Sequence, residues 1–459
     1  MKATFDNSFA ALPPRMFTAL TPAAVASPAL IIRNEALAED IGLTLEDTDV
    51  AVFAGNVVPD GASPLAQLYA GHQFGNWNPQ LGDGRAILLG EVVGPDGIRR
   101  DLQLKGSGPT PYSRGGDGRA WLGPVLREYV VSEAMHALGI PTTRALAAVT
   151  TGEIVYRETA LPGAILTRVA RSHLRVGTFQ VYASRGQTDL LQTLCDYAIA
   201  RHYPDADGPA GLLAAVISAQ AKLIAKWMSV GFIHGVMNTD NASIADETID
   251  YGPCAFMDAY HPGRVFSSID HMGRYAYQNQ PNIAAWNMAQ LATALIPLMP
   301  DRDAAITDFT HAVNDLPHQF QAAWRAEFGK KLGISALGVA DEPLVNDLLD
   351  LMAQDQADFT NVFANLDTAH DQFVDREAYD DWHARWTERR DTSPINPQII
   401  PRNHQIEAMI TAAVAGDFAP FHALLAATTD PFAPLTDKTR DFAKPPTADE
   451  QVTRTFCGT

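Results

Sequence analysis

The residue types best suited to chemistry lie in the stretch His234–Asn241 (HGVMNTDN) and in Asp250-Tyr251-Gly252, which begins nine residues after it. Asp240, Asn241 and Asp250 offer oxygen donors only. Carboxylate and amide oxygens are the ligands that Mg²⁺ prefers, usually together with substrate phosphates. The spacing therefore predicts a magnesium site formed by Asn241 and Asp250 with phosphate oxygens. Asp240 is then free to act as a general base on an incoming hydroxyl.

The order of these residues is similar to that in protein kinases, where a loop of the form HRDxxxxN precedes a DFG whose Asp holds the metal. Asn241 follows Val236 by five residues, as the kinase Asn follows the catalytic Asp. Val236, however, stands where the kinase base belongs. We therefore predict kinase-type metal binding without the kinase base. The alternative is structural, because Asp-Asn and Asp-Tyr-Gly are also ordinary turn sequences.

Lys105 and Glu128 form a second candidate pair. Along the predicted strand before Gly106, Leu102 and Leu104 lie on one face, and Gln103 and Lys105 on the other. Glu128 falls on the apolar stripe of a predicted helix, where an unpaired carboxylate would be unfavourable. An ion pair between strand and helix satisfies both groups and directs the ammonium at phosphates, as in kinases. Taken alone, a lysine at a strand end is more often a solvated edge charge.

Two near-duplicate glycine segments, Leu81–Arg85 (LGDGR) and Gly115–Arg119 (GGDGR), add possible phosphate contacts. Asp-Gly alone is a common turn pair, but backbone N–H groups beside a guanidinium make an anion cradle. A further cluster suggests a polyphosphate pocket near the junction of the two halves, with surface charge as the equal alternative. It comprises Arg168, Arg171, His173 and Arg175. His72 and His234 are interpreted as structural.

The composition excludes several classes of protein. The net charge of −19, from 34 Lys and Arg against 53 Asp and Glu, argues against nucleic-acid or anionic-membrane partners. Three cysteines without a CxxC pair predict neither a disulfide framework nor a zinc site, and suit a reducing cytoplasm. The N-terminus is unlike a signal peptide. No run of about 18 apolar residues is apparent, so no membrane span is expected.

The order of elements predicts an α+β, bilobal, protein-kinase-like fold with the nucleotide in the cleft between lobes. Residues 1–183 are predicted to form a β-rich nucleotide-binding lobe with one helix over 123–138. Its strands are expected at 85–93, 101–105, 144–149, 154–157 and 164–169. Residues 184–459 are predicted to form a larger, mainly helical lobe carrying the loop 234–241, two short strands around Ile244 and Ile249, and a C-terminal tail. Its helices are expected at 190–203, 212–230, 283–298, 302–328, 342–364, 368–389 and 404–427.

Long strings of the sequence resemble the selenoprotein O family of protein adenylyltransferases. They extend from about residue 63 to 404, with a Cys third from the C-terminus as a further mark. The strings are SPLAQLYAGHQFGNWNPQLGDGRAILLGE, LQLKGSGPTPYSRGGDGRA, REYVVSEAMHALGIPTTRAL, SHLRVG, GFIHGVMNTDN, DYGP and NPQIIPRNH.

The resemblance implies a pseudokinase fold that binds ATP in a flipped orientation and transfers AMP to Ser, Thr or Tyr hydroxyls of protein substrates. Asn241 and Asp250 would hold Mg²⁺ or Mn²⁺, Glu128 would pair with Lys105, and Asp240 would accept the proton. The resemblance assigns nucleotide contacts to Gly82, Gly84, Arg85, Lys105, Asp117, Gly118, Arg168, Arg175 and Asp250.

The resemblance also suggests a redox role for Cys457, because some members pair this cysteine with one in the segment after the metal-binding Asp. Here that segment offers only Cys254, so an unpaired tail cysteine is the competing interpretation. The alternatives for the whole chain are a protein or small-molecule kinase, a UMP transferase, and an inactive nucleotide-binding regulator. We expect a cytoplasmic monomer.

Overall fold

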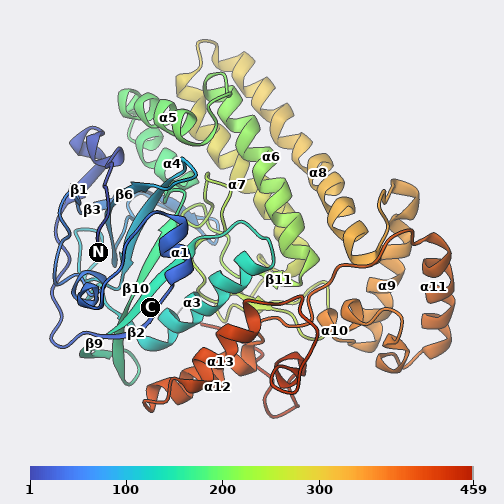
Figure 1. Cartoon of the computed structure of the whole chain (residues 1–459). Coiled ribbons are helices and arrows are strands. Elements are labelled where there is room, and N and C mark those ends of the chain that lie inside the picture. The colour runs from blue at the N-terminus through green and yellow to red at the C-terminus, as the bar shows by residue number, and fades with distance from the viewer. Residues whose placement is uncertain (457–459) are drawn as a thin grey trace.

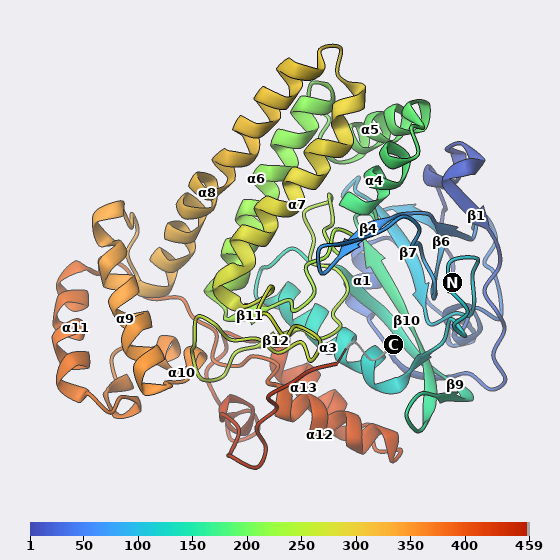
Figure 2. The ribbon, with the colours of Figure 1, turned by 180° about the vertical axis from the view of Figure 1, so that it is seen from behind.

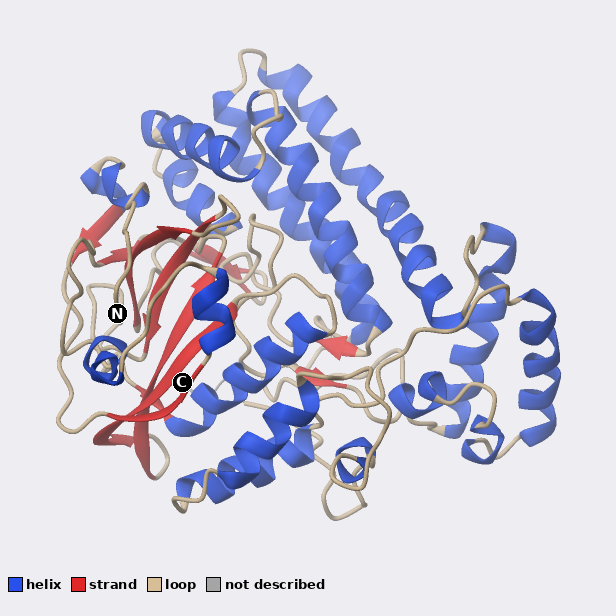
Figure 3. Cartoon of the chain, in the orientation of Figure 1, coloured by secondary structure: helices blue, strands red, loops and turns tan. Residues whose placement is uncertain are grey.

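The computed structural model describes residues 1–456 of the chain. Its strands gather on one side and its long helices on the other (Figure 3). The fold is α+β, with an antiparallel sheet in the N-terminal part and helices over most of the C-terminal part. Cys457, for which the resemblance suggests a redox role, lies outside the described residues.

The main sheet has eight strands in the order β1-β3-β6-β7-β10-β9-β2, with β8 paired to β10. Every pairing in it is antiparallel. Its strands are Phe17–Ala19 (β1), Ala29–Arg33 (β2), Leu65–Gln67 (β3), Ala86–Val93 (β6), Arg99–Lys105 (β7), Ala120–Trp121 (β8), Arg144–Tyr156 (β9) and Ala160–Ala170 (β10). A separate hairpin pairs β4 (Gly71–Gln73) with β5 (Asn76–Asn78).

Both faces of the main sheet are covered, which explains its nearly continuous runs of buried residues. Leu102 and Leu104 pack with the N-terminal helices α1 (Glu35–Asp40) and α2 (Val50–Phe53). The other face carries α3 (Leu122–Ala137), which packs on β9 and β10. Because side chains alternate along a strand, Gln103 and Lys105 face away from Leu102 and Leu104, toward α3.

Two expectations about strands are wrong. The strands expected at 144–149 and 154–157 are one strand, β9, which continues through Gly152 at a φ of +69°. The strands expected around Ile244 and Ile249 are absent; this segment makes only isolated bridges, through Ser243 and Thr248. The short pair of strands lies on either side of it instead, at β11 (Phe232–Ile233) and β12 (Ala255–Phe256).

Ten α-helices follow β10 within the described residues. In Figure 1, α6, α7 and α8 run side by side next to the sheet, and α9 to α11 lie at the far end of α8. The bounds are Val176–Ser184 (α4), Thr188–His202 (α5), Gly208–Ser229 (α6), Gln280–Leu295 (α7), Arg302–Leu332 (α8), Glu342–Asp355 (α9), Phe359–Ala364 (α10), Arg376–Arg389 (α11), Asn403–Val414 (α12) and Ala419–Thr428 (α13).

Three helices that the sequence predicted as continuous are interrupted, because the apolar periodicity continues through a turn. The helix expected at 342–364 stops at Gln356, which has a φ of +53°, and restarts after Asp358, whose carboxylate caps the N–H of Asn361. The helix expected at 404–427 is interrupted at Gly416, which has a φ of +94°. A glycine adopts this conformation without steric penalty and commonly ends a helix. The helix expected at 368–389 becomes a short 3₁₀ turn followed by α11.

By length and composition alone, α6 could cross a membrane, contrary to the expectation that no such run exists. It packs against α7 and α8, and 56% of its most apolar window is buried inside the protein. Leu223 and Ile224 belong to the main hydrophobic core. These contacts are those of a core helix.

The C-terminal helices α12 and α13 return to pack on α3, the helix that carries Glu128. Arg127, the neighbouring residue on α3, donates to Asn403 Oδ1 (3.0 Å) and to the carbonyl of Cys254. The helix is thereby held from its outer side by residues almost 280 positions away in the sequence.

Arg402, just before α12, is completely buried and bonds both Asp258 and Asp358. Arg402→Met would leave these two carboxylates without a positive partner. We expect it to lower the free energy of unfolding by about 3–5 kcal/mol. The control Arg385→Met removes an exposed pair with Asp347 and should change stability by less than about 1 kcal/mol. Urea unfolding of the two variants measures both free energies of unfolding. An equal loss of stability in the two would contradict a structural role for the buried Arg402 ion pairs.

Candidate active site

Four charged side chains meet between the main sheet and the segment that follows the loop 234–241. Lys105 Nζ lies 2.6 Å from Glu128 Oε2 and 2.6 Å from Asp250 Oδ1. Arg168 Nη2, from β10, lies 2.5 Å from Glu128 Oε1 and 3.4 Å from Asp250 Oδ1. The ion pair expected between Lys105 and Glu128 is formed. It belongs to a cluster of two cations and two carboxylates, called here the charge cluster.

The register of three neighbouring strands assembles the cations of the charge cluster. Gln103 on β7 lies opposite Arg168 on β10, and Lys105 lies opposite Ala86 on β6. Arg85 directly precedes Ala86 and, with Lys105 and Glu128, lines a small cavity of about 110 Å³. Lys105 on β7, Arg168 on β10 and Arg85, just before β6, therefore lie near the same end of the sheet.

The cations keep both carboxylates of the charge cluster ionised. Burial alone would raise the pKa of Glu128, but Arg168 and Lys105 hold that pKa below its usual value. Burial opposes ionisation of Asp250 as well, yet Lys105, Arg168 and Arg85 keep its pKa well below the usual value. The Asp250 side chain is 29% exposed against 3% for Glu128, so Asp250 is the carboxylate that a ligand can reach.

A chain of polar contacts connects the charge cluster to the loop 234–241. Arg168 Nη1 donates to Gln103 Oε1 (3.4 Å), and Gln103 Nε2 donates to Asp83 Oδ2 (3.4 Å). Asp83 Oδ1 lies 4.0 Å from Arg175 Nη2, and Arg175 Nη1 donates to the carbonyl of Asp240 (3.1 Å). The predicted residues Lys105, Arg168, Arg175, Asp240 and Asp250 thus belong to one continuous network.

The motifs do not reveal Tyr69, an aromatic side chain inside this network. The Arg175 guanidinium lies 4.3 Å from the centre of its ring. The pKa of the Tyr69 hydroxyl is raised, chiefly by burial. The nearby carboxylates of Asp83, Asp240 and Asp250 raise this pKa further, and the Arg175 guanidinium opposes them in part. In sequence Tyr69 looks like an ordinary core aromatic, so only the fold reveals its place among these charges.

Hydrogen bonds connect the segments that carry Asn241 and Asp250. Asn241 Nδ2 donates to the carbonyl of Val236 (3.1 Å), and Val236 N donates to His234 Nδ1 (3.3 Å). His234 Nε2 lies 2.9 Å from the carbonyl of Ile249, the residue before Asp250. His234 therefore braces the loop, as expected. Asp250 itself has a φ of +68°, an uncommon conformation for a residue with a side chain and one that concentrates at functional sites.

The donor set suits a hard cation bound together with phosphates. Within residues 1–456, no group of three His, Cys, Asp or Glu residues is arranged to hold a metal ion unaided. The hydrogen bond of Asn241 uses its amide nitrogen, and both ion pairs of Asp250 use Oδ1. One oxygen of each residue is left for a ligand, and Mg²⁺ typically takes one or two protein oxygens and completes its shell with phosphates and water.

The glycine segment 81–85 packs against the loop that follows β7. A Cβ at Gly82 would lie 2.5 Å from the Tyr112 ring, and one at Gly84 would lie 2.8 Å from the Tyr112 carbonyl. Thr110 Oγ1 donates to the carbonyl of Asp83 (2.7 Å). Glycine at these positions therefore allows the two backbones to approach closely.

Asp117 and Gly118 have other partners than the residues of the charge cluster. The Asp117 carboxylate pairs with Arg157 at 2.8 Å near the surface, and a Cβ at Gly118 would clash with the backbone of Gly108. Neither residue has a hydrogen bond or ion pair to Lys105, Asp240 or Asp250 among the contacts within residues 1–456.

The predicted basic cluster divides into two pairs. Arg168 and Arg175 enter the network, but His173 Nδ1 bonds Asp101 Oδ2 at 2.8 Å, and burial lowers the pKa of His173 to about 4. A neutral, buried His173 serves the fold. Arg171 uses its backbone N–H to bond Glu247 and lines a different cavity.

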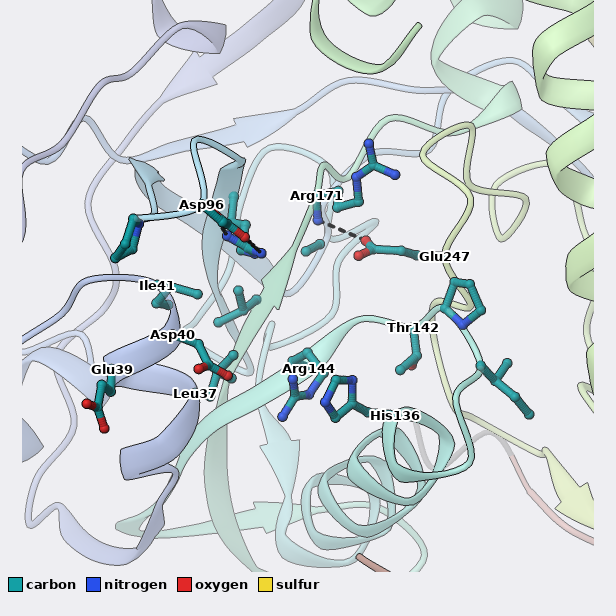
Figure 4. Close-up of a pocket in the computed structure, with 16 residues that line it drawn as sticks. Leu37, Glu39, Asp40, Ile41, Asp96, His136, Thr142, Arg144, Arg171 and Glu247 are labelled. Carbon is teal, nitrogen blue, oxygen red and sulfur yellow. Dashed lines mark hydrogen bonds and ion pairs between the residues drawn. The ribbon is translucent and has the colours of Figure 1, made fainter. Parts of the chain in front are cut away.

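That second cavity, of about 560 Å³, lies at the C-terminal ends of α3 and β10 (Figure 4). Arg144, His136 and Glu247 line it, and burial raises the pKa of Glu247 to about 8. Of the residues expected to bind nucleotide, phosphate or metal, Arg171 alone lines this cavity. The cavity and the charge cluster therefore have no residue in common.

Comparison with known proteins shows the family to which the chain belongs. Residues 1–429 match the family described as "Protein adenylyltransferase SelO". The chain is 63% identical to "Protein nucleotidyltransferase YdiU" of Roseobacter denitrificans, over 100% of this chain and 99% of that protein. Proteins of the same description from Ruegeria sp. and Ruegeria pomeroyi are each 62% identical, over 99% of both chains. The chain belongs to the SelO family of protein adenylyltransferases and is a protein nucleotidyltransferase.

Proposed function

We propose that this enzyme transfers AMP from Mg²⁺-bound ATP to Ser, Thr or Tyr hydroxyls of protein substrates, with ATP flipped relative to its orientation in kinases. The observation that carries the proposal is the convergence of Lys105, Arg168 and Asp250 at one point. A triphosphate with a divalent ion needs this combination of cations and a metal-binding carboxylate.

Burial of the cations supports the flipped orientation. Arg168 and Arg175 are each only 4% exposed, so two guanidinium groups lie in the deepest part of the site. A buried cation favours a phosphate over an apolar base as its neighbour. The β- and γ-phosphates would then lie deepest and the α-phosphorus nearer the entrance, where a protein hydroxyl can approach.

The roles of the side chains follow from this placement. Asp240 would take the proton of the hydroxyl, whose oxygen attacks the α-phosphorus while the bond to pyrophosphate breaks. Lys105, Arg168 and Arg175 would stabilise the negative charge of the departing pyrophosphate. Asn241 and Asp250 would hold Mg²⁺, which neutralises phosphate charge when bound.

The kinase-like fold is part of the proposal. A β-sheet whose lysine pairs with a glutamate on the following helix is the arrangement of protein kinases, and Lys105 and Glu128 have it. The division into lobes at residues 183 and 184 stays a prediction, as do the cytoplasmic location and the monomeric state. The choice of ATP over UTP belongs to the proposal as well, because the relatives are described as nucleotidyltransferases, and [α-³²P]UTP in place of ATP tests it.

The reaction type is tested by incubating the enzyme and a protein extract with Mg²⁺ and labelled ATP. We expect label on protein from [α-³²P]ATP and none from [γ-³²P]ATP, with an intact-mass increase of one AMP on modified protein. Asp250→Ala should abolish the transfer. Label from the γ position alone would establish a kinase, and nucleotide binding without transfer would indicate an inactive regulator.

Lys105→Met removes the ammonium shared by Glu128 and Asp250. We expect kcat/KM for ATP to fall by about 10²-fold or more, because a buried charge that stabilises the transition state is lost. Lys330→Met is the matched control, since Lys330 is exposed and pairs only with Glu327 among the ion pairs within residues 1–456. Steady-state kinetics measure kcat/KM for ATP in both variants. Similar values in the two would contradict the proposed role of Lys105.

The metal requirement is tested by chelation. We expect EDTA to remove activity and excess Mg²⁺ or Mn²⁺ to restore it. Asn241→Ala should raise the Mg²⁺ concentration needed for half-maximal rate by about tenfold, because one of two protein oxygens is lost. Full activity in EDTA, or an unchanged Mg²⁺ requirement in Asn241→Ala, would refute the proposed ligand set.

A further inference from the structure

The β4–β5 hairpin is hydrogen-bonded to the loop 234–241 through the backbone N–H groups of two residues. His72 N donates to Thr239 Oγ1 at 2.7 Å, and Phe74 N donates to Asn238 Oδ1 at 2.9 Å. The hairpin lies beside α4, outside the main sheet (Figure 2). An element about 165 residues earlier in the chain thus sets the position of this loop.

Gln73, between these two residues, contacts the proposed base directly. Its Nε2 donates to Asp240 Oδ2 at 3.0 Å. Asp240 Oδ1 is buried and has no hydrogen-bond partner within residues 1–456, and it lies against Gly71, where a Cβ would come within 2.8 Å of it. A carboxylate has about four lone-pair sites. The contact with Gln73 fixes the orientation of Asp240 and leaves a further lone pair on Oδ2 for a hydroxyl, since Oδ1 is buried against Gly71.

The hairpin is itself held firmly enough to act as a support. The His72 ring packs on Trp77 and on Trp286, at 4.8 and 5.3 Å between ring centres. His72 Nδ1 lies 3.0 Å from Gln180 Nε2, on α4. The hairpin is thereby fixed to α4 and α7.

We propose that Gln73 is a positioning residue for AMP transfer, which holds the Asp240 carboxylate in the orientation needed to receive the hydroxyl proton. This inference rests on the proposed function. An amide is suited to the task because it donates a hydrogen bond without bringing a positive charge. A lysine or arginine would pair with Asp240 and compete for the oxygens that the hydroxyl needs. Gln73 touches Asp240 and has no reacting atom of its own.

The test is a comparison of Gln73→Met and Gln73→Glu in the full-length enzyme. Methionine keeps the length of the side chain and loses the donor, whereas glutamate also sets a second carboxylate beside Asp240. We expect kcat to fall by about 10²-fold for Met, and further for Glu, with the KM and Kd for ATP unchanged. The exposed Asn76 of the same hairpin gives the control Asn76→Ala, which should keep the wild-type kcat and melting temperature.

A double-mutant cycle of Gln73→Met and Asp240→Asn distinguishes a failure of this inference from a failure of the proposed function. If Gln73 acts through Asp240, adding Gln73→Met to Asp240→Asn causes no further loss of kcat. Wild-type kcat in Gln73→Met would overturn the role of Gln73, and so would a parallel increase in the Kd for ATP. Wild-type kcat in Asp240→Asn would instead refute the general base of the proposed function.

Discussion

The site depends on keeping several cations buried and charged before any nucleotide arrives. Removing an ammonium or a guanidinium from water is unfavourable by several kcal/mol per ion unless an opposite charge replaces the water. Glu128 and Asp250 supply that charge to Lys105 and Arg168. Glu128 is enclosed, whereas Asp250 is partly exposed. Under the proposed function, Asp250 is therefore the partner that would exchange its contact with Lys105 for a contact with a divalent ion, which would free the Lys105 ammonium for a phosphate.

Distant parts of the chain cooperate to hold this arrangement. The strands β7 and β10 supply the cations through their register, and α3 supplies Glu128. The C-terminal helices brace α3 from outside, through Arg127 and Asn403. Arg175 and the β4–β5 hairpin hold the loop that carries Asp240. Most of these contacts join residues that are far apart in the sequence. The site therefore forms only when the whole fold is complete.

The parts of the fold and site predicted correctly from the sequence are those with strong local signals. Alternation along β7 placed Lys105 opposite Leu102 and Leu104, and the helical stripe placed Glu128 toward it. Two predictions about strands were wrong. Gly152 was expected to end a strand, but a glycine can continue one, and the short apolar segment around Ile244 does not pair into a strand. The role of Gln73 could not be foreseen, since nothing in GHQFG indicates that the hairpin contacts residue 240. Long-range contacts of this kind leave no periodic pattern in the sequence.

The most direct measurement of the central claim is a crystal structure with Mn²⁺ and a non-hydrolysable ATP analogue, with the metal located by anomalous scattering. We expect a manganese peak bonded to Asn241 Oδ1 and the Asp250 carboxylate. We also expect the triphosphate to contact Lys105, Arg168 and Arg175. A nucleotide bound in the cavity near Glu247, or a metal without contact to Asp250, would contradict the proposed site.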